Sequence, residues 1–335
     1  MNEPVQGVAA SARKRVLLIA ARFFGYELEI AEEFKRQGAY VDMLPDRPFD
    51  SALPKALTRL RPQLTRPAAD RFFGEQLERF ARSAYDLILV IQGETISANT
   101  LSAMRRMFPQ AHMVYYTWDS LANKPFAEAN LHLYDRCLTF DPIDAVQYGM
   151  ETRPLFFTSG FERSGVCDLR FEISFVGTIH SDRYRIVRRI ALGLPAESQV
   201  NSYLYLQAPW MYWMRRLFTR TVAGSRLGEF RFEPLSKSTV QRIFFSSKAI
   251  LDIEHPNQRG LTMRTIETLG SCTKLITTNA AVRNYDFYNP SNICVIDRND
   301  VQLDPSFLES SYEPVPLTIY QRYRLNQWVK DVSAE

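Results

Sequence analysis

The sequence predicts an α/β protein built from two Rossmann-like α/β/α domains. Its 335 residues are close to the length of two domains of ~150 residues each. Apolar, strand-like runs alternate with helical patterns along the chain, which is typical of doubly wound parallel sheets. The same plan, a strand that runs into a glycine turn and then a helix, begins near residue 15 and again near residue 170. Two similar halves are therefore expected.

The N-terminal half opens with a βαβ pattern. Residues 15–20 and 40–44 are expected to be strands on either side of a helix. In that helix Leu28, Ala31 and Phe34 share one face, which we expect to be buried. Further segments with a strand, or a strand followed by a helix, are expected at 85–97, 111–120 and 135–149.

The C-terminal half repeats the alternation after the loop-like stretch 158–168. Strands are expected from about 170 to Gly177 and at 202–207, 249–254 and 274–278, with helices at 235–249, from about Leu261, and at 318–332. We therefore expect an N-terminal domain at 1–160, a C-terminal domain at 161–317, and a final helical segment at 318–335 that packs back towards the N-terminal domain.

Composition narrows the class of protein. Hydrophobic residues make up 46% and charged residues 23% of the chain, so it can form sizeable cores. The formal net charge of +4 is too small to indicate a nucleic-acid partner but is compatible with anionic small ligands or an anionic membrane surface. Four dispersed cysteines without a CxxC pair indicate neither a zinc site nor a disulfide scaffold, and because the first dozen residues contain no apolar run, secretion is not expected. A cytoplasmic location and no cofactor are expected.

The stretch "QRGLTMRTIETLG" at 258–270 is the strongest candidate for a ligand site. It follows an apolar strand and opens a helix, an arrangement that offers backbone N–H groups to an anion. Arg259 and Arg264 would approach a diphosphate, because guanidinium groups suit phosphate oxygens. Glu267 lies on the face of Arg264 and can accept two ribose hydroxyls. The alternative is that Arg264 and Glu267 form an ordinary surface ion pair.

The segment "HPNQRGLTMRTIETLGSCTKLITTN" at 255–279 resembles the donor site of GT-B glycosyltransferases. The segment "FVGTIHSDRYRIV" at 175–187 resembles the start of their C-terminal domain, notably in the bacterial group that includes CgeB-like proteins and lipopolysaccharide or capsule transferases. The resemblance implies a GT-B-like fold, with the two domains facing across a cleft, and a nucleotide-sugar donor.

The resemblance also implies roles for individual residues. Glu267 would hold the ribose, Arg259 and Arg264 would lie near the diphosphate, and Gly177 and Thr178 would form the floor between the domains. Gly260 and Leu261 belong to the same donor segment. Better-known members carry an acidic residue eight positions before the equivalent of Glu267; because that position here is Arg259, the sequence departs from the pattern behind their retaining mechanism.

His180 and Arg183 follow the glycine turn at 177 and are candidates for contacts with the donor phosphates. An ordinary polar loop role is the alternative for His180. The single glycine of "FVGTIH" matches neither a dinucleotide-binding fingerprint nor a P-loop.

An acceptor site is expected in the N-terminal half. Phe23, Phe24, Gly25 and Tyr26 follow the first strand and so lie at its carboxyl end, where aromatic rings can stack on a sugar or an acyl carrier. Core packing is the alternative for Phe23 or Phe24.

Two carboxylates also end strands in this half. Asp119, in "TWDS", is the first candidate for the general base that takes the proton of the acceptor hydroxyl, and Glu94, in "QGE", is the second. The alternative for Asp119 is a cap on the following turn. The chain has no Asp-x-Asp element, so transfer is expected to need no metal, with arginines and helix N-termini neutralising the leaving diphosphate.

The aromatic and basic stretch "APWMYWMRRLF" at 208–218 has two interpretations. Trp210, Trp213, Met214 and Leu217 fit the buried face of a helix, which is the favoured interpretation. The same mix would suit peripheral contact with the inner membrane face.

The expected function is transfer of a hexose from a nucleotide-diphosphate sugar to a glycan or lipid-linked acceptor in bacterial surface polysaccharide synthesis. The alternatives are a nucleotide-sugar epimerase and a non-catalytic nucleotide-sugar-binding protein on the same fold.

Overall fold

The computed structural model describes residues 13–47, 62–123, 125–163, 165, 167–256 and 258–334. These residues form two compact units. The first contains the residues up to Thr139, the short segment Tyr148–Glu151 and the chain from Val329 onwards; the second contains Phe140–Gln147 and Thr152–Trp328. Domain limits at 160 and 317 remain predictions.

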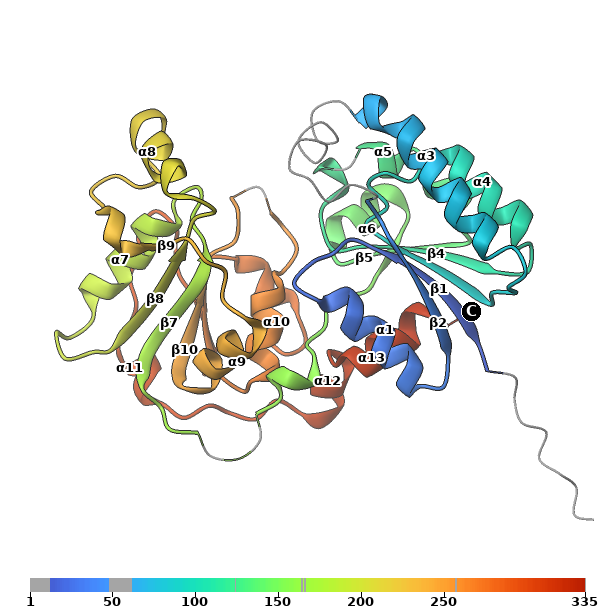
Figure 1. Ribbon diagram of the computed structural model, residues 1–335. Coiled ribbons are helices and arrows are strands. Elements are labelled where there is room, and N and C mark those ends of the chain that lie inside the picture. Colours follow the sequence, from blue (N-terminus) through green and yellow to red (C-terminus); the bar gives the residue numbers. More distant parts are fainter. Residues whose placement is uncertain are drawn as a thin grey trace, which may run out of the picture. The chain divides into compact units, whose positions relative to one another are not determined.

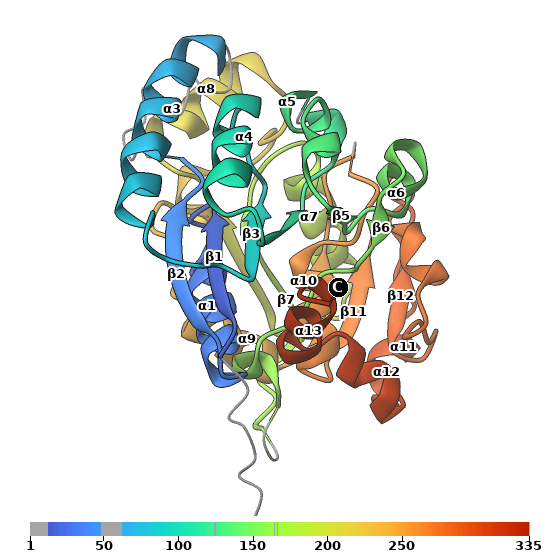
Figure 2. The same cartoon turned by 90° about the vertical axis from the view of Figure 1, so that its right-hand side faces the viewer.

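The first unit is built on a six-stranded sheet in the order β2-β1-β3-β4-β5-β6, in which the neighbours from β2 to β5 pair in parallel. Figure 1 shows α3 and α4 on one face of this sheet and α1 on the other, and Figure 2 shows β1 and β2 side by side. The strands are β1 (Arg15–Ala20), β2 (Tyr40–Pro45), β3 (Leu87–Ile91), β4 (His112–Thr117), β5 (Arg136–Thr139) and β6 (Glu151–Thr152). The helices and turns that lie between β1 and the start of the second sheet in the sequence are α1 (Tyr26–Arg36), α3 (Pro62–Arg79), α4 (Ala98–Met107), η1 (Leu121–Asn123), α5 (Pro125–Glu128), η2 (Leu131–Leu133), α6 (Pro142–Tyr148) and η3 (Ser159–Phe161).

The apolar pattern explains this unit, with one correction. All five residues of β3 are buried, as expected for a strand covered on both faces. Helix α1 begins after Gly25, which has a φ of +76° that favours glycine. Ala31 and Phe34 are buried as expected, but Leu28 is 57% exposed and Ile30 takes its place in the core. The prediction for Leu28 was wrong because the buried stripe of α1 runs along the neighbouring side of the helix.

The second unit is built on another six-stranded sheet, in the order β12-β11-β10-β7-β8-β9 with parallel pairing throughout. Figure 1 shows α7 on one face of this sheet and α9 and α10 on the other. The strands are β7 (Phe171–Thr178), β8 (Val200–Tyr205), β9 (Phe230–Arg231), β10 (Ser247–Asp252), β11 (Lys274–Thr277) and β12 (Ile293–Val295). The helices and turns are α7 (Arg183–Gly193), α8 (Pro209–Phe218), η4 (Leu227–Glu229), α9 (Lys237–Phe245), α10 (Met263–Gly270), η5 (Ala280–Asn284), α11 (Ser306–Glu309), α12 (Leu317–Arg322) and α13 (Leu325–Val332).

The C-terminal segment forms two helices where one was expected. The N–H of Phe157 donates to the carbonyl of Tyr323 (2.8 Å), and the N–H of Leu325 donates to the carbonyl of Phe157 (2.9 Å). The carbonyl of Tyr323 and the N–H of Leu325 therefore bond to Phe157 and not within a helix. For this reason α12 ends and α13 begins at this point.

The favoured interpretation of residues 208–218 was also wrong. Helix α8 forms, but Tyr212 is its buried aromatic residue, whereas the residues expected in the core are exposed. These exposed residues are Trp210, Trp213, Met214 and Leu217, joined by Phe218. The periodicity located an apolar face correctly, but this face points to solvent.

Among the helices that the structure describes, none is both long and apolar enough to cross a membrane.

Candidate functional site

The functional candidates of the second unit lie at the carboxyl ends of the neighbouring strands β11, β10 and β7. We call this side of the sheet its carboxyl edge, or strand edge. Strand β7 leads into α7, β10 leads into α10, and β11 leads into the turn η5. Ligands of open α/β sheets bind beyond the carboxyl ends of the strands, so this edge is the natural place for a site.

Asp252 connects the end of β10 to the first turn of α10. The residue is 0% exposed, and its carboxylate accepts hydrogen bonds from the hydroxyl groups of Thr262 and Thr265 and from Nη1 of Arg264 at 3.0 Å. Thr262 also caps α10, because its Oγ1 accepts from the N–H of Thr265 at 3.2 Å. The sequence interpretation did not include Asp252; an acidic residue at the end of the apolar run "AILDIE" was the signal available.

The side chain of Arg183 links the end of β7 to the end of β10 by hydrogen bonds. Its Nε donates to the carbonyl of Ile253 (2.6 Å) and its Nη1 to the carbonyl of Thr178 (2.9 Å). Within the part of the chain that the structure describes, these bonds go to carbonyl oxygens rather than to a carboxylate. Burial, together with the nearby positive charge of Arg264, lowers the pKa of Arg183 to about 10. The guanidinium stays charged at neutral pH, in surroundings that favour a bound anion.

Gly177 lies where the two arginines approach each other. A methyl group at this position would lie 3.3 Å from Nη2 of Arg264 and 3.5 Å from Nη1 of Arg183. Both guanidinium groups therefore reach the same stretch of β7 backbone, and glycine at 177 lets them approach it closely. Two guanidinium groups that converge in this way form a suitable site for phosphate oxygens.

His180 lies beside this cluster as a neutral imidazole. Burial first, and then the positive charge of Arg183, lower its pKa to about 3. Its Nδ1 is 3.1 Å from Oγ of Ser181, and its ring centroid is 5.3 Å from that of His255. At neutral pH this side chain can exchange hydrogen bonds with a ligand but adds no positive charge.

Arg298 joins three strand or helix ends and was also missed by the sequence analysis. Its Nη1 donates to Asp182, the N-cap of α7, at 2.6 Å. Its Nη2 donates to the carboxylate of Glu254 and, at 3.2 Å, to Oγ1 of Thr278. This ion-pair network fixes the loops after β7, β10 and β11 relative to one another.

The start of the donor-like segment contains residues of different exposure. Arg259 is exposed, whereas Leu261 is 2% exposed, so its side chain belongs to the core and only its backbone can face a ligand. Gly260 is covered by Phe140: a methyl group at Gly260 would lie 2.4 Å from Cε2 of that ring. Glycine is needed there because the chain passes directly under an aromatic ring.

Glu267 is 6% exposed. It lies on α10 among the buried residues Thr265–Gly270 and is therefore not part of an ordinary surface ion pair. Arg264 donates instead to Asp252. A donor role for Glu267 stays a prediction, but its burial makes an alanine substitution a poor test because a cavity would result.

In the first unit, the two candidate bases lie in different surroundings. Glu94 forms an ion pair with Arg47 at 2.8 Å and follows Gln92 and Gly93, whose φ values of +77° and +62° bend the chain sharply after β3. Asp119 follows β4, and its Oδ1 accepts from the N–H of Ser120 at 3.0 Å. The Asp119 carboxylate thus contacts the backbone of the following residue and is partly exposed, so both the general-base role and the capping alternative stay predictions.

The aromatic candidates for the acceptor also differ from one another. Tyr26 is 5% exposed and belongs to the core, whereas Phe23 and Phe24 are 40% and 71% exposed. The ring of Phe23 is 5.7 Å from that of Trp118, which the sequence analysis did not include. The exposed ring of Phe23 and the half-buried ring of Trp118 therefore bridge the ends of β1 and β4. Core packing is wrong for Phe24.

Among the residues that the structure describes, no group of three or more His, Cys, Asp or Glu side chains is arranged to hold a metal ion.

The chain matches no protein-family model. It is also not significantly similar in sequence to any curated protein. Solved structures are similar to it over nearly its whole length. The apo structure of OtsA has a TM-score of 0.65 at 10% identity and covers 96% of this chain and 100% of that chain. HepE from Anabaena in complex with UDP-glucose has a TM-score of 0.61 at 12% identity, covering 96% of this chain and 98% of that chain. A glycosyltransferase from Rickettsia africae has a TM-score of 0.58 at 11% identity, covering 96% and 97%.

At these identities the similarity establishes the fold. The protein has the GT-B-type α/β architecture with two parallel six-stranded sheets, as the sequence predicted.

Proposed function

We propose that this protein is a glycosyltransferase that binds a nucleotide-diphosphate sugar at the carboxyl edge of the second sheet. The observation that carries the proposal is the convergence of Arg183 and Arg264 on Gly177. The N-termini of α7 and α10 lie at the same edge, so a diphosphate would meet two guanidinium groups and two helix N-termini. The fold shared with HepE, whose structure holds UDP-glucose, supports this class of ligand.

Other residues of this edge would complete the donor site. Glu267 would accept the ribose hydroxyls, while Arg259 and His180 would contact the phosphates. Because Glu267 is buried, Glu267→Gln is the appropriate variant: it keeps the shape and removes the charge. We expect donor affinity to fall by roughly 10-fold or more, since a charge-assisted hydrogen bond contributes ~1.5–3 kcal/mol. Unchanged affinity by calorimetry would reject the ribose role.

The chemical step is a displacement at the anomeric carbon. The acceptor hydroxyl oxygen forms the new glycosidic bond, the bond between the anomeric carbon and the phosphate oxygen breaks, and the nucleotide diphosphate leaves. The hydroxyl proton passes to a carboxylate, for which Asp119 is the first candidate and Glu94 the second. Arg183 and Arg264 would neutralise the charge that develops on the diphosphate, so we propose that no metal is required.

For the acceptor we propose a glycan or a lipid-linked sugar, handled in the cytoplasm during bacterial surface polysaccharide synthesis. The sequence resemblance to the CgeB-like and lipopolysaccharide or capsule transferase group supports this proposal. The exposed rings of Phe23 and Phe24 and the half-buried ring of Trp118 support it too, because aromatic faces stack on sugars. A hexose is the proposed sugar.

The donor proposal is tested by calorimetry on Arg183→Gln. The variant loses a guanidinium whose hydrogen bonds, among the residues that the structure describes, go to the carbonyls of Ile253 and Thr178, so affinity for UDP-glucose or the best of a panel of nucleotide sugars should fall roughly 10- to 150-fold. Arg170→Gln is the matched control, since Arg170 is 70% exposed and pairs with Asp168 outside the strand edge. A melting curve on each variant separates lost binding from lost folding. Equal affinity of both variants would contradict the proposal.

The reaction is tested by incubating the protein with the bound nucleotide sugar, with and without candidate acceptors, and measuring released nucleotide diphosphate. Acceptor-dependent release that survives EDTA is expected. Activity that disappears in EDTA and returns with magnesium or manganese would overturn the metal-independent mechanism. Epimerised sugar formed without an acceptor would favour an epimerase, and tight binding without hydrolysis or transfer would favour a non-catalytic binding protein.

A further inference from the structure

Helix α8 presents an apolar face to solvent. Its exposed residues follow the i, i+3, i+4, i+7, i+8 spacing of one helix face: Trp210, Trp213, Met214, Leu217 and Phe218. Leu217 and Phe218 are 76% and 80% exposed. Figure 1 shows α8 in yellow at the top of the second unit, above α7. Large apolar side chains gathered on one exposed face mark a contact surface more often than chance.

The opposite side of α8 is anchored. Tyr212 is 2% exposed, and its hydroxyl donates to the carbonyl of Ser225 at 3.0 Å. Arg216 donates to that same hydroxyl group at 2.8 Å and to the same carbonyl at 3.0 Å. The helix is thus held to the second unit by its polar and aromatic inner side, with the apolar face directed outwards.

The segment of sequence that contains α8 is basic. Between Glu197 and Glu229 the sequence contains no acidic residue, but it contains Arg215, Arg216, Arg220 and Arg226. A segment with this composition is electrostatically complementary to an anionic surface.

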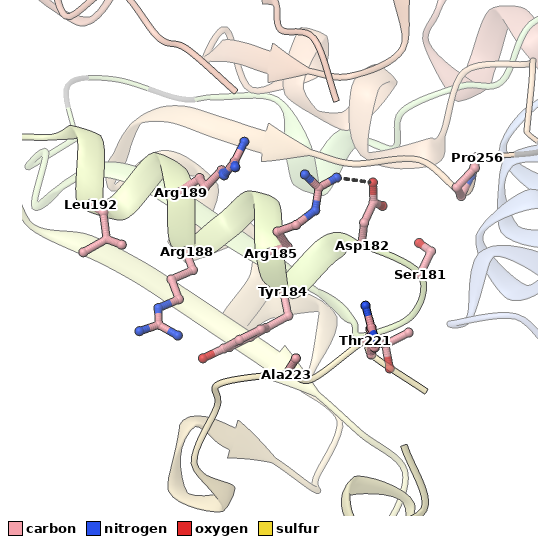
Figure 3. A pocket seen from close by; sticks show the side chains of 11 residues that line it. Ser181, Asp182, Tyr184, Arg185, Arg188, Arg189, Leu192, Thr221, Ala223 and Pro256 are labelled. Atoms are coloured by element: carbon pink, nitrogen blue, oxygen red, sulfur yellow. Dashed lines mark hydrogen bonds and ion pairs between the residues drawn. The ribbon is translucent and has the colours of Figure 1, made fainter. Parts of the chain in front are cut away.

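A basic pocket lies next to α8. Its volume is about 660 Å³, and it is formed by α7 and by the chain that follows α8. Arg185, Arg188, Arg189 and Arg220 line the pocket, and Figure 3 shows the first three on α7, with Arg185 and Arg189 directed to one side of the helix and Arg188 to the other. The acidic residue of the lining, Asp182, is engaged by Arg185 at 3.2 Å and by Arg298 at 2.6 Å. The pocket therefore carries a net positive charge and can accept a phosphate group.

We propose that α8 and this basic pocket form a docking surface for an anionic lipid bilayer. The outward residues of α8 enter the boundary between headgroups and acyl chains, and the arginines of the pocket contact headgroup phosphates. A protein partner is disfavoured by the composition of α8 and its flanks: two tryptophans beside aliphatic side chains, in a segment that contains arginines but no acidic residue between Glu197 and Glu229, match a bilayer interface. The inference goes beyond the proposed function, because lipid binding requires no sugar transfer.

The test is co-sedimentation of the full chain with vesicles of phosphatidylglycerol and phosphatidylcholine or of phosphatidylcholine alone. The unmodified protein should bind the anionic vesicles, more weakly at high salt, and much less to the neutral ones. Leu217→Ser/Phe218→Ser should lower partitioning roughly 30-fold, because two apolar side chains no longer leave water. Arg188→Gln/Arg220→Gln should lower it roughly 10- to 30-fold on anionic vesicles, since each arginine near such a surface contributes ~1 kcal/mol.

The matched control is Val146→Ser/Leu317→Ser, which removes two exposed apolar side chains (87% and 65% exposed) elsewhere in the second unit. It should bind vesicles like the unmodified protein.

A second measurement is the quenching of tryptophan fluorescence by brominated lipid. This quenching should be lost in Trp210→Phe/Trp213→Phe, although that variant should still sediment with the vesicles. Equal binding of the Leu217 and Phe218 variant, or equal binding to neutral and anionic vesicles, would overturn the proposal. Lipid-independent dimers that dissociate in this variant would assign the face to a second copy of the chain and also overturn it.

Discussion

Replacing Gly177 by alanine tests whether the convergence of arginines is a phosphate site. The added methyl group would lie 3.1 Å from Cζ of Phe175, 3.3 Å from Nη2 of Arg264 and 3.5 Å from Nη1 of Arg183. All three atoms are the far ends of side chains, so shifts of a few tenths of an ångström relieve the contacts at a cost of about 1 kcal/mol. The lower backbone entropy of the unfolded alanine chain offsets part of that cost. Stability should therefore change little.

Ligand binding should change much more. The methyl group occupies the space that a phosphate oxygen would need between the two guanidinium groups, so at least one charge-assisted hydrogen bond is lost. At ~1.5–3 kcal/mol for such a bond, affinity for the nucleotide sugar should fall roughly 10- to 150-fold. Calorimetry measures this fall, and a thermal melt checks the fold.

Gly193→Ala is the matched control, since a methyl group there meets nothing within 4 Å. Gly193 is the last residue of α7, at the end remote from the strand edge. If Gly177→Ala folds normally and binds the donor as tightly as the control does, the reasoning about the site is refuted.

Three further predictions concern stability and chemistry. Gly260→Ala should cost ~1–3 kcal/mol in urea unfolding, because the methyl would lie 2.4 Å from the Phe140 ring; an unchanged midpoint would contradict this. Because the folded-state pKa of His180 is lowered to about 3 from 6.5, the unfolded chain binds the extra proton between these values, so stability falls as pH falls through that window. The slope is at most ~1.4 kcal/mol per pH unit and smaller for this partly exposed ring, and His180→Gln should flatten the difference in urea titrations from pH 7 to pH 4. Asp119→Asn should lower turnover ~10²–10⁴-fold in steady-state kinetics with little change in donor affinity, whereas near-normal turnover together with a collapse in Glu94→Gln would move the base to Glu94.

Local patterns predicted most of the fold. The buried strand β3 is a continuous apolar run, and α10 begins at Met263 with Thr262 as its cap, close to the start expected at Leu261. These signals are encoded within a few residues, by apolar periodicity and by capping chemistry.

The parts that were missed depend on distant partners. Arg298 lies 116 residues from Asp182 and 44 from Glu254, so no local motif could indicate their ion pairs. The prediction that the apolar face of α8 is buried was wrong for another reason. Periodicity identifies an apolar face, but whether that face is buried depends on what packs against it, and here Tyr212 and Arg216 attach the other side.

The contact between Asp252 and Arg264 has a consequence for how this site can evolve. Removing Arg264 would leave the buried carboxylate of Asp252 without its cationic partner, which lowers the free energy of unfolding by about 3–5 kcal/mol. Removing Asp252 would in turn leave the guanidinium of Arg264 without its carboxylate partner. Neither residue can therefore drift alone without weakening the second unit. In an alignment of homologues the two positions should covary, and sequences in which position 252 is neutral should also lack the arginine at 264. Searching for this acid–arginine pair, twelve positions apart across a strand end and a helix start, would find distant homologues that, like this chain, lack the acidic residue eight positions before the equivalent of Glu267.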